Sequence, residues 1–284
     1  MARLIKNIGI IGKQEFLDRP DLVPKFKTAM AKLGCKLIYI NQSPDNAILG
    51  KCDLVLTLGG DGTILKVARS IAGFKRRPFI LGVNMGIVGF LSELPPDDVI
   101  KELPSFINGD CKKDMRRLLE VEVFRNNRKI FKSYALNDAV INQGPFARML
   151  NLNIQINDKL MSEFRGDGVI VATTTGSTGH SLAAGGSIIH PRLEAFIITP
   201  LIPASLSMRP IIVPDNRIIK VQLTARKPLQ TEVRVTVDGQ VSAGIKYGDK
   251  VVVKRTEASI TFLRKKDKNF YSTLRQKLHW GESF

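Results

Sequence analysis

The first hundred residues alternate between short apolar runs and longer segments with helical spacing of apolar side chains. The apolar runs predict buried strands at residues 5–11, 36–40, 54–58 and 79–83. The helical spacing predicts helices at 20–33, 63–72 and 97–107, the last entered through Pro95-Pro96. Strands that alternate with helices are typical of a parallel sheet covered by helices. The pattern therefore predicts an α/β fold for this part of the chain.

Beyond about Arg116 the pattern changes to short strands separated by turns. Apolar segments at 118–124 and 129–134 flank Asn126-Asn127 and predict a hairpin. Residues 151–157 alternate polar and apolar side chains, as a half-buried strand does. Further strands are predicted at 169–172, 217–224, 232–237, 250–254 and 258–263. This part is therefore expected to be mainly β and sandwich-like.

These two patterns define the expected domains. The change lies near residues 108–116, so we predict an α/β domain over 1–110 and a β-rich domain over 111–263. The tail at 264–284 has mixed helix propensity, and we expect it to fold back on the first domain.

Composition restricts the class of protein. The 284 residues are 44% hydrophobic and 24% charged, which suits a chain that buries a core and disfavours disorder, collagen or a coiled coil. Lys and Arg number 43 against 26 Asp and Glu, a formal net charge of +17. Such a surplus favours anionic partners, from nucleic acid to phosphorylated metabolites, or a basic solvated surface. Composition does not choose among these.

Cysteine usage and hydropathy indicate a cytoplasmic, soluble protein. Three cysteines without a Cys-x-x-Cys pair argue against a disulfide framework or a structural zinc site. No apolar run approaches the roughly 18 residues of a membrane span, and Pro200 and Pro203 interrupt the apolar stretch at 196–206. The N-terminus also lacks the apolar core of a signal peptide.

The sharpest chemical signal is a glycine-rich turn between a predicted strand and a predicted helix, Gly59-Gly-Asp-Gly-Thr63. Its glycines let the backbone approach a ligand, and the helix N-terminus that follows can bind phosphate. We expect Thr63 to cap this helix and Lys66, one turn in, to reach a phosphate. Asp61 beside phosphates is disfavoured by repulsion unless it binds a metal or accepts a proton. The alternative is a plain turn in which the aspartate caps the helix.

Two further clusters carry polar groups at close quarters. The segment from Gly166 to Pro191 is rich in Gly, Ser and Thr, as a site for a polar small molecule would be. Its His180 and His190 could act in acid–base chemistry, although ligand contact or a structural role is the favoured interpretation. Asn137 and Asp138 are adjacent polar residues in the apolar segment 135–141, where a ribose diol would satisfy both. A strand edge or turn is the alternative for that pair.

Together these clusters resemble the NAD kinase family, which phosphorylates the adenosine 2′-hydroxyl of NAD to make NADP. The resemblance runs from about Ile8 to Gln240 and keeps the family's motif order. It is carried by Gly59-Gly-Asp-Gly-Thr63, Asn137-Asp138, Thr175-Gly-Ser-Thr178 and Leu182-Ala-Ala-Gly-Gly186. The segment from Gly82 to Glu93 also resembles the family's glycine-rich loop that ends in Gly-Phe-Leu. The resemblance implies an N-terminal α/β domain that binds the phosphate donor and a β-rich domain that binds NAD.

The resemblance also implies roles for individual residues. Asp61 would be the base that takes the proton from the 2′-hydroxyl. The phosphate-donor loop would be Gly59, Gly60, Gly62 and Thr63. Asn137 and Asp138 would bind the ribose and nicotinamide side, residues 178–183 would form the adenine and ribose wall, and Phe90 would pack on adenine. The implied NAD contacts are Asp61, Gly62, Lys66, Phe90, Asn137, Asp138, Arg148, Arg165, Asp167, Thr178, Gly179, His180, Ser181, Leu182, Ala183 and Gln240.

This chain departs from the family pattern at two positions. Thr178-Gly179-His180-Ser181 stands where Thr-Ala-Tyr-Ser is common, and Thr174 stands where proline is frequent. The resemblance further implies a divalent metal such as Mg²⁺ and a homodimer or homotetramer. It leaves open ATP or polyphosphate as donor, acceptance of NADH, and feedback by NADPH.

Two other functions compete with this prediction. A lipid or sphingoid kinase can carry the same glycine-rich turn, but this chain shows no amphipathic membrane face. A nucleic-acid-binding protein would fit the charge and the basic residues Arg264, Lys265, Lys266 and Lys268. No nucleic-acid motif supports that alternative, and aromatic residues are only 7%, few for a stacking surface. We therefore expect partners to be nucleotides, with no nucleic acid and no membrane.

Overall fold

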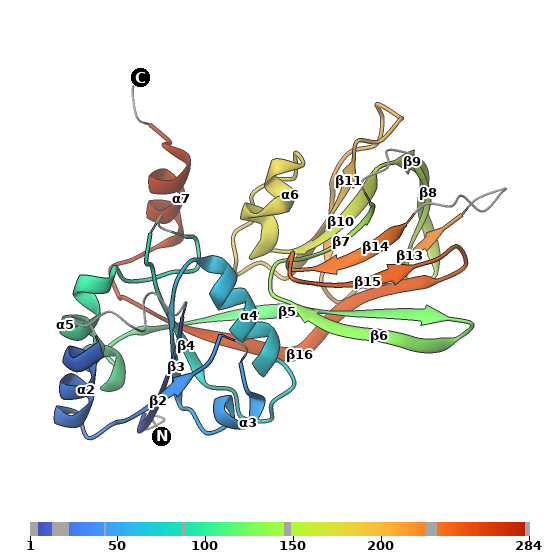
Figure 1. Cartoon of the computed structure of the whole chain (residues 1–284). Coiled ribbons are helices and arrows are strands. Elements are labelled where there is room, and N and C mark those ends of the chain that lie inside the picture. The colour runs from blue at the N-terminus through green and yellow to red at the C-terminus, as the bar shows by residue number, and fades with distance from the viewer. Residues whose placement is uncertain are drawn as a thin grey trace. The chain divides into compact units, whose positions relative to one another are not determined.

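The computed structural model describes residues 5–12, 23–42, 44–86, 89–144, 149–224 and 232–281 (Figure 1). The chain divides into two compact units. Unit 1 comprises residues 1–115 together with 260–284, and unit 2 comprises 116–259.

Unit 1 is built on a parallel sheet whose strand order is β2-β1-β3-β4. The strands are β1 (Asn7–Gly12), β2 (Lys36–Ile40), β3 (Leu54–Leu58) and β4 (Phe79–Val83). The end of β16 (Lys250–Arg264) pairs with β4 in parallel through Phe262 and Ile80. The helices are α2 (Val23–Lys32), α3 (Asn46–Leu49), α4 (Asp61–Ile71), α5 (Pro96–Ile107) and α7 (Phe270–Leu278).

Helices cover both faces of this sheet. All five residues of β3 are buried, as expected for a central parallel strand. Leu54, Leu56 and Leu58 share one apolar core with buried side chains of α2 and α5. Helix α4 packs against β3 and β4 and buries Ile64, Leu65, Val67, Ala68 and Ile71, spaced as on one helical face. The predicted α/β fold of the N-terminal part is confirmed.

Unit 2 is a sandwich of antiparallel strands. One sheet has the order β12-β11-β10-β7-β14-β15, and the strands opposite it include the ladder β16-β13-β8-β9 and the hairpin β5-β6. Buried side chains from both sets of strands form one apolar core. The predicted β-rich, sandwich-like fold is confirmed. The strands and short helices of this part are β5 (Lys112–Arg125), β6 (Arg128–Ala135), β7 (Asp138–Gln143), β8 (Leu150–Ile156), β9 (Lys159–Gly166), β10 (Gly168–Thr173), η1 (Gly176–Thr178), α6 (His180–Ala183), β11 (Ala195–Leu201), β12 (Ile211–Pro214), β13 (Ile219–Leu223), β14 (Val233–Val237) and β15 (Val241–Ile245).

Several element boundaries differ from the sequence prediction. The strands predicted at 250–254 and 258–263 are one strand, β16, because the polar residues between them remain extended rather than turning. The segment 135–141 is interrupted at Leu136 and Asn137, so Asp138 begins β7. The sequence patterns did not predict α3, β9, β11, β12 or β15. Within the described ranges, every helix is too short or too polar to cross a membrane.

The β5-β6 turn is the hairpin predicted at Asn126-Asn127. Both asparagines have positive φ, 49° and 60°, as a two-residue type I′ connection requires. We expect Asn127→Ala to destabilise the protein by about 1 kcal/mol, because alanine is strained in the left-handed region, whereas Asn127→Gly should retain or raise stability. Urea unfolding followed by circular dichroism compares the two variants. Equal midpoints for both would contradict this account of the turn.

Candidate functional site

The glycine-rich turn of unit 1 begins directly after the buried strand β3. Helix α4 begins at Asp61 with Gly60 as its N-cap, and no side chain caps it. The expectation that Thr63 caps this helix is wrong: its N–H donates to the Gly60 carbonyl at 3.1 Å, inside the first turn. A Cβ on Gly59 would lie 2.7 Å from the Thr63 hydroxyl oxygen. The first turn of α4 therefore presents its partial positive charge beside a turn that needs glycine.

The Asp61 carboxylate is fixed by the loop that follows β4. The Phe90 N–H donates to Asp61 Oδ2 at 2.8 Å, and the Leu91 N–H donates to Oδ1 at 3.2 Å. A Cβ on Gly89 would lie only 1.8 Å from Oδ1, so the loop can approach the carboxylate only with glycine at that position. Asp61 remains partly exposed. A carboxylate has about four lone-pair sites, so the two amides orient it and leave capacity to accept a further proton.

The other residues predicted around this turn have local contacts. Lys66 Nζ donates to the backbone carbonyl of Gln42, just after β2, at 2.9 Å. Phe90 is partly buried and contacts Asp61 through its backbone. Gly60 and Gly62 are exposed.

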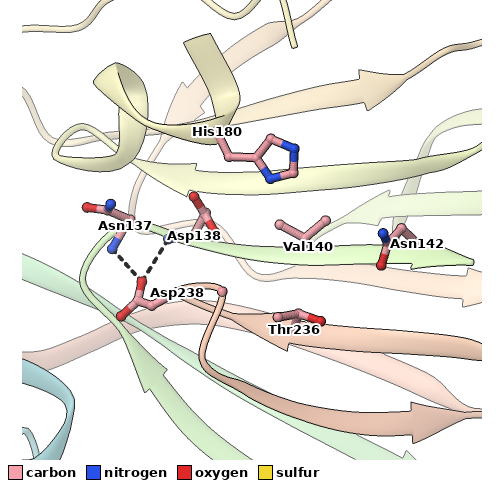
Figure 2. A pocket seen from close by; sticks show the side chains of 8 residues that line it. Asn137, Asp138, Val140, Asn142, His180, Thr236 and Asp238 are labelled. Carbon is pink, nitrogen blue, oxygen red and sulfur yellow. Dashed lines mark hydrogen bonds between the residues drawn. The ribbon is translucent and has the colours of Figure 1, made fainter. Parts of the chain in front are cut away.

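Unit 2 contains a cavity of about 310 Å³ between β7, β14 and the start of α6 (Figure 2). The period of two along β7 places alternate side chains on the cavity face, while Ala139 and Ile141 enter the apolar core. Of the residues predicted to bind NAD, the cavity brings together Asn137, Asp138 and His180. The remaining lining residues were not predicted from the sequence: Val140, Asn142, Thr236, Asp238 and Gly239.

Asp238 determines the geometry of the turn between β6 and β7. Its carboxylate accepts the backbone N–H groups of Leu136, Asn137 and Asp138 at 3.0, 2.8 and 3.2 Å. Asp238 itself has a φ of 50° in the turn between β14 and β15, a conformation that aspartate tolerates. The adjacent Asp238-Gly239 pair is a feature of the sequence from which this turn could have been predicted.

Two polar groups of this cavity are in unusual environments. Burial and, secondarily, the nearby Asp238 carboxylate raise the pKa of Asp138 from 3.8 to about 7. The Asn137 side-chain oxygen is buried and accepts no hydrogen bond from the described part of the chain. Buried polar atoms are normally paired, so this acceptor, unpaired within the described residues, makes Asn137 a candidate for ligand contact.

The Thr-rich segment packs directly on the Asn137 turn. The Thr173 hydroxyl donates to the Leu136 carbonyl at 2.6 Å. A Cβ on Gly176 would lie 2.3 Å from the Asn137 carbonyl oxygen, so glycine is required there. The Ser181 hydroxyl is fully buried and bonds that of Thr199 at 2.9 Å. The Ser181 hydroxyl is thus bonded inside the chain, while the neighbouring His180 is exposed and lines the cavity.

The other predicted contacts in the described part of unit 2 lie outside the lining of this cavity. Arg165 is exposed on β9, and the Asp167 carboxylate accepts a hydrogen bond from the Gln143 amide at 3.4 Å. The Gln240 N–H donates to the Val237 carbonyl at 3.0 Å. Arg148 falls outside the described residues. The other predicted wall residues that are absent from the lining are Thr178, Gly179, Leu182 and Ala183.

The positions of the histidine and carboxylate side chains limit how this chain could bind a metal ion. His190 accepts the Arg192 N–H at 3.2 Å through Nδ1, which favours its structural interpretation. Across the described ranges, no group of three His, Cys, Asp or Glu side chains is arranged to hold a metal ion. A dedicated protein cage for Mg²⁺ therefore does not fit these residues. Mg²⁺ that is held by the phosphates and water of a nucleotide needs no such cage.

The raised pKa of Asp138 makes a prediction about stability. Between about pH 4 and pH 7 the folded chain retains a proton that unfolded Asp138 has released, so this contribution to stability falls as the pH rises and is lost at about pH 7. We expect Asp138→Asn to lose less stability than the wild type between pH 5 and pH 8. Thermal unfolding at both pH values measures this, with Asp158→Asn, an exposed carboxylate, as the control. Identical pH dependence in wild type and Asp138→Asn would contradict the assignment.

Comparisons with known proteins agree over both units. The family model described as the ATP-NAD kinase N-terminal domain matches residues 14–111, and the ATP-NAD kinase C-terminal domain matches 136–265. The NAD kinase of Solibacter usitatus is 36% identical over 289 residues, covering 98% of this chain and 99% of the relative. The NAD kinase of Geotalea daltonii is 39% identical over 232 residues, covering 82% and 80%.

Two solved structures share the fold. Yeast NADH kinase complexed with NADH has a TM-score of 0.88 at 25% identity and covers 100% of this chain and 90% of its own. An NAD kinase from Archaeoglobus fulgidus in complex with ATP has a TM-score of 0.77 at 25% identity, covering 96% and 98%. Because both domain models match and a relative of similar length aligns over nearly all of it, this chain belongs to the NAD kinase family of enzymes.

Proposed function

We propose that this enzyme transfers the terminal phosphoryl group of ATP to the adenosine 2′-hydroxyl of NAD, giving NADP and ADP. The observation that carries the proposal is the Asp61 carboxylate, oriented by two backbone amides at the start of α4. The similar structures were solved with NADH and with ATP, which supports a dinucleotide acceptor and a nucleotide donor.

In the proposed reaction the 2′-oxygen attacks the γ-phosphorus and the bond from that phosphorus to the β–γ bridging oxygen breaks. ADP leaves with the bridging oxygen, and the proton of the 2′-hydroxyl passes to Asp61. Because phosphoryl transfer is accelerated mainly by alignment and charge stabilisation, a carboxylate held in one orientation is more useful than a mobile one. General-base assistance of this kind contributes about 10²–10⁴-fold.

The phosphates are proposed to lie against the turn Gly59–Gly62 and the N-terminus of α4. Glycine allows backbone amides to approach the phosphate oxygens, and the helix supplies partial positive charge. Mg²⁺ that enters with ATP would offset the charge of the phosphates. Lys66, one turn into α4, is proposed to add its ammonium charge to this region. Inorganic polyphosphate is the alternative donor.

In unit 2 the cavity around Asn137 and Asp138 is proposed to bind polar groups of NAD. The buried Asn137 oxygen can accept from a hydroxyl or an amide. Protonated Asp138 can donate to a substrate oxygen near neutral pH, and His180 offers a ring beside them. The remaining proposed contacts are Phe90, Arg148, Arg165, Asp167, Thr178, Gly179, Ser181, Leu182, Ala183 and Gln240. A homodimer or homotetramer in the cytoplasm also remains a proposal.

We expect Asp61→Asn to fold and to lower kcat by about 10²-fold or more, because asparagine loses the base and keeps only one of the two oxygens that accept the Phe90 and Leu91 N–H groups. NADP formation from NAD, ATP and Mg²⁺ is measured through an NADP-specific dehydrogenase. Asp97→Asn is the matched control, since Asp97 also lies in the first turn of a helix, α5. Turnover by Asp61→Asn at the control's rate would exclude Asp61 as the base.

A further inference from the structure

The loop after β4 contains a carboxylate that the proposed reaction does not use. The Glu93 side chain is completely buried, with 0% exposure. Its oxygens accept from Arg264 Nη1 at 3.0 Å and from the Lys265 N–H at 2.7 Å, and Lys268 Nζ lies 3.4 Å away. A buried carboxylate is costly unless it is paired and hydrogen-bonded. Three groups of the C-terminal segment 264–268 meet that need, namely the side chains of Arg264 and Lys268 and the Lys265 N–H.

The Arg264 side chain also binds the backbone of the loop that follows β4. Nη1 donates to the Leu91 carbonyl at 2.7 Å, and Nε donates to Asp114 at 3.3 Å. The side chain is 11% exposed, and its guanidinium lies 5.2 Å from the centre of the Phe262 ring. Arginine can make these contacts together because its donors are fixed in a planar fork, which lysine lacks.

Leu91 connects this network to Asp61. Its N–H donates to Asp61 Oδ1, while its carbonyl accepts from Arg264. The next residues are fixed too: the Ser92 hydroxyl accepts the Gly89 N–H at 3.0 Å, and Lys268 Nζ donates to the Ser92 and Glu93 carbonyls, each at 3.2 Å. The loop 89–93 is thus held on two sides. Its backbone N–H groups bind Asp61, and its backbone carbonyls and the Glu93 side chain bind Arg264 and Lys268. All of these residues belong to unit 1.

We propose that Arg264 and Glu93 are positioning residues for phosphoryl transfer, which fix the loop 89–93 so that its amides hold Asp61 in the reactive orientation. The proposal rests on the proposed function of Asp61. A buried ion pair adds little net stability compared with apolar packing, so the role assigned to this pair is to restrict the conformations of the loop that it binds. An error of about 1 Å in placing a reacting group costs up to about 10²-fold in rate. The Arg264–Glu93 pair is therefore expected to affect kcat through the position of the Asp61 carboxylate.

The test compares Arg264→Lys with the same substitution at Arg125, which forms a two-pronged ion pair with Asp249 at 3.0 and 2.7 Å in unit 2. We expect Arg264→Lys to lower kcat by about tenfold or more, with KM for NAD and ATP within about twofold of wild type. Arg125→Lys should retain kcat. Glu93→Gln, which is isosteric, should reproduce the kcat effect, and thermal unfolding establishes that each variant is folded.

A second readout does not depend on turnover. Amide hydrogen exchange at Phe90 and Leu91 should be slow in the wild type, faster in Arg264→Lys and Glu93→Gln, and unchanged in Arg125→Lys. Unchanged exchange and unchanged kcat in both loop variants would overturn the positioning role, as would a rise in KM with kcat retained. Failure of the wild type to form NADP with either donor would instead count against the proposed function, and hydrogen exchange would still show whether Arg264 orders the loop.

Discussion

The Asp61 carboxylate and the two amides that bind it are the constraint on which the candidate chemistry of unit 1 depends. Asp61 follows β3 and the amides of Phe90 and Leu91 follow β4, and these two strands are parallel neighbours. The carboxyl ends of parallel strands meet at one edge of the sheet, where ligands of α/β folds commonly bind. The sheet thereby brings together groups that are 29 and 30 residues apart in the chain.

Unit 2 uses the same kind of interaction for a different purpose. Asp238 accepts three backbone N–H groups and fixes the turn that carries Asn137 and Asp138. Its negative charge also disfavours ionisation of buried Asp138. One carboxylate therefore fixes the turn that lines the cavity and adds to the effect of burial, the main cause of the raised pKa of Asp138.

The contacts of the basic C-terminal segment, residues 264–268, change the interpretation of its charge. Arg264 and Lys268 bind Glu93, Lys265 binds Glu102, and Lys266 binds Asp110. Each of these four cations is paired with a carboxylate of unit 1, which weakens the case for nucleic-acid binding by this segment. The match of both ATP-NAD kinase domain models likewise favours the NAD kinase family over a lipid kinase.

The sequence determined the fold class, the β5-β6 hairpin and the glycine-rich turn, because hydrophobic period and turn residues act over short distances. It also indicated Asn137, Asp138 and His180, which the cavity brings together. Only the tertiary structure showed that Gly60 rather than Thr63 caps α4, that the Ser181 hydroxyl bonds that of Thr199, and that Asp238 and Glu93 organise their loops. Glu93 pairs with Arg264, 171 residues later in the chain. Local sequence patterns do not predict such contacts, because strand order and burial determine which distant residues meet.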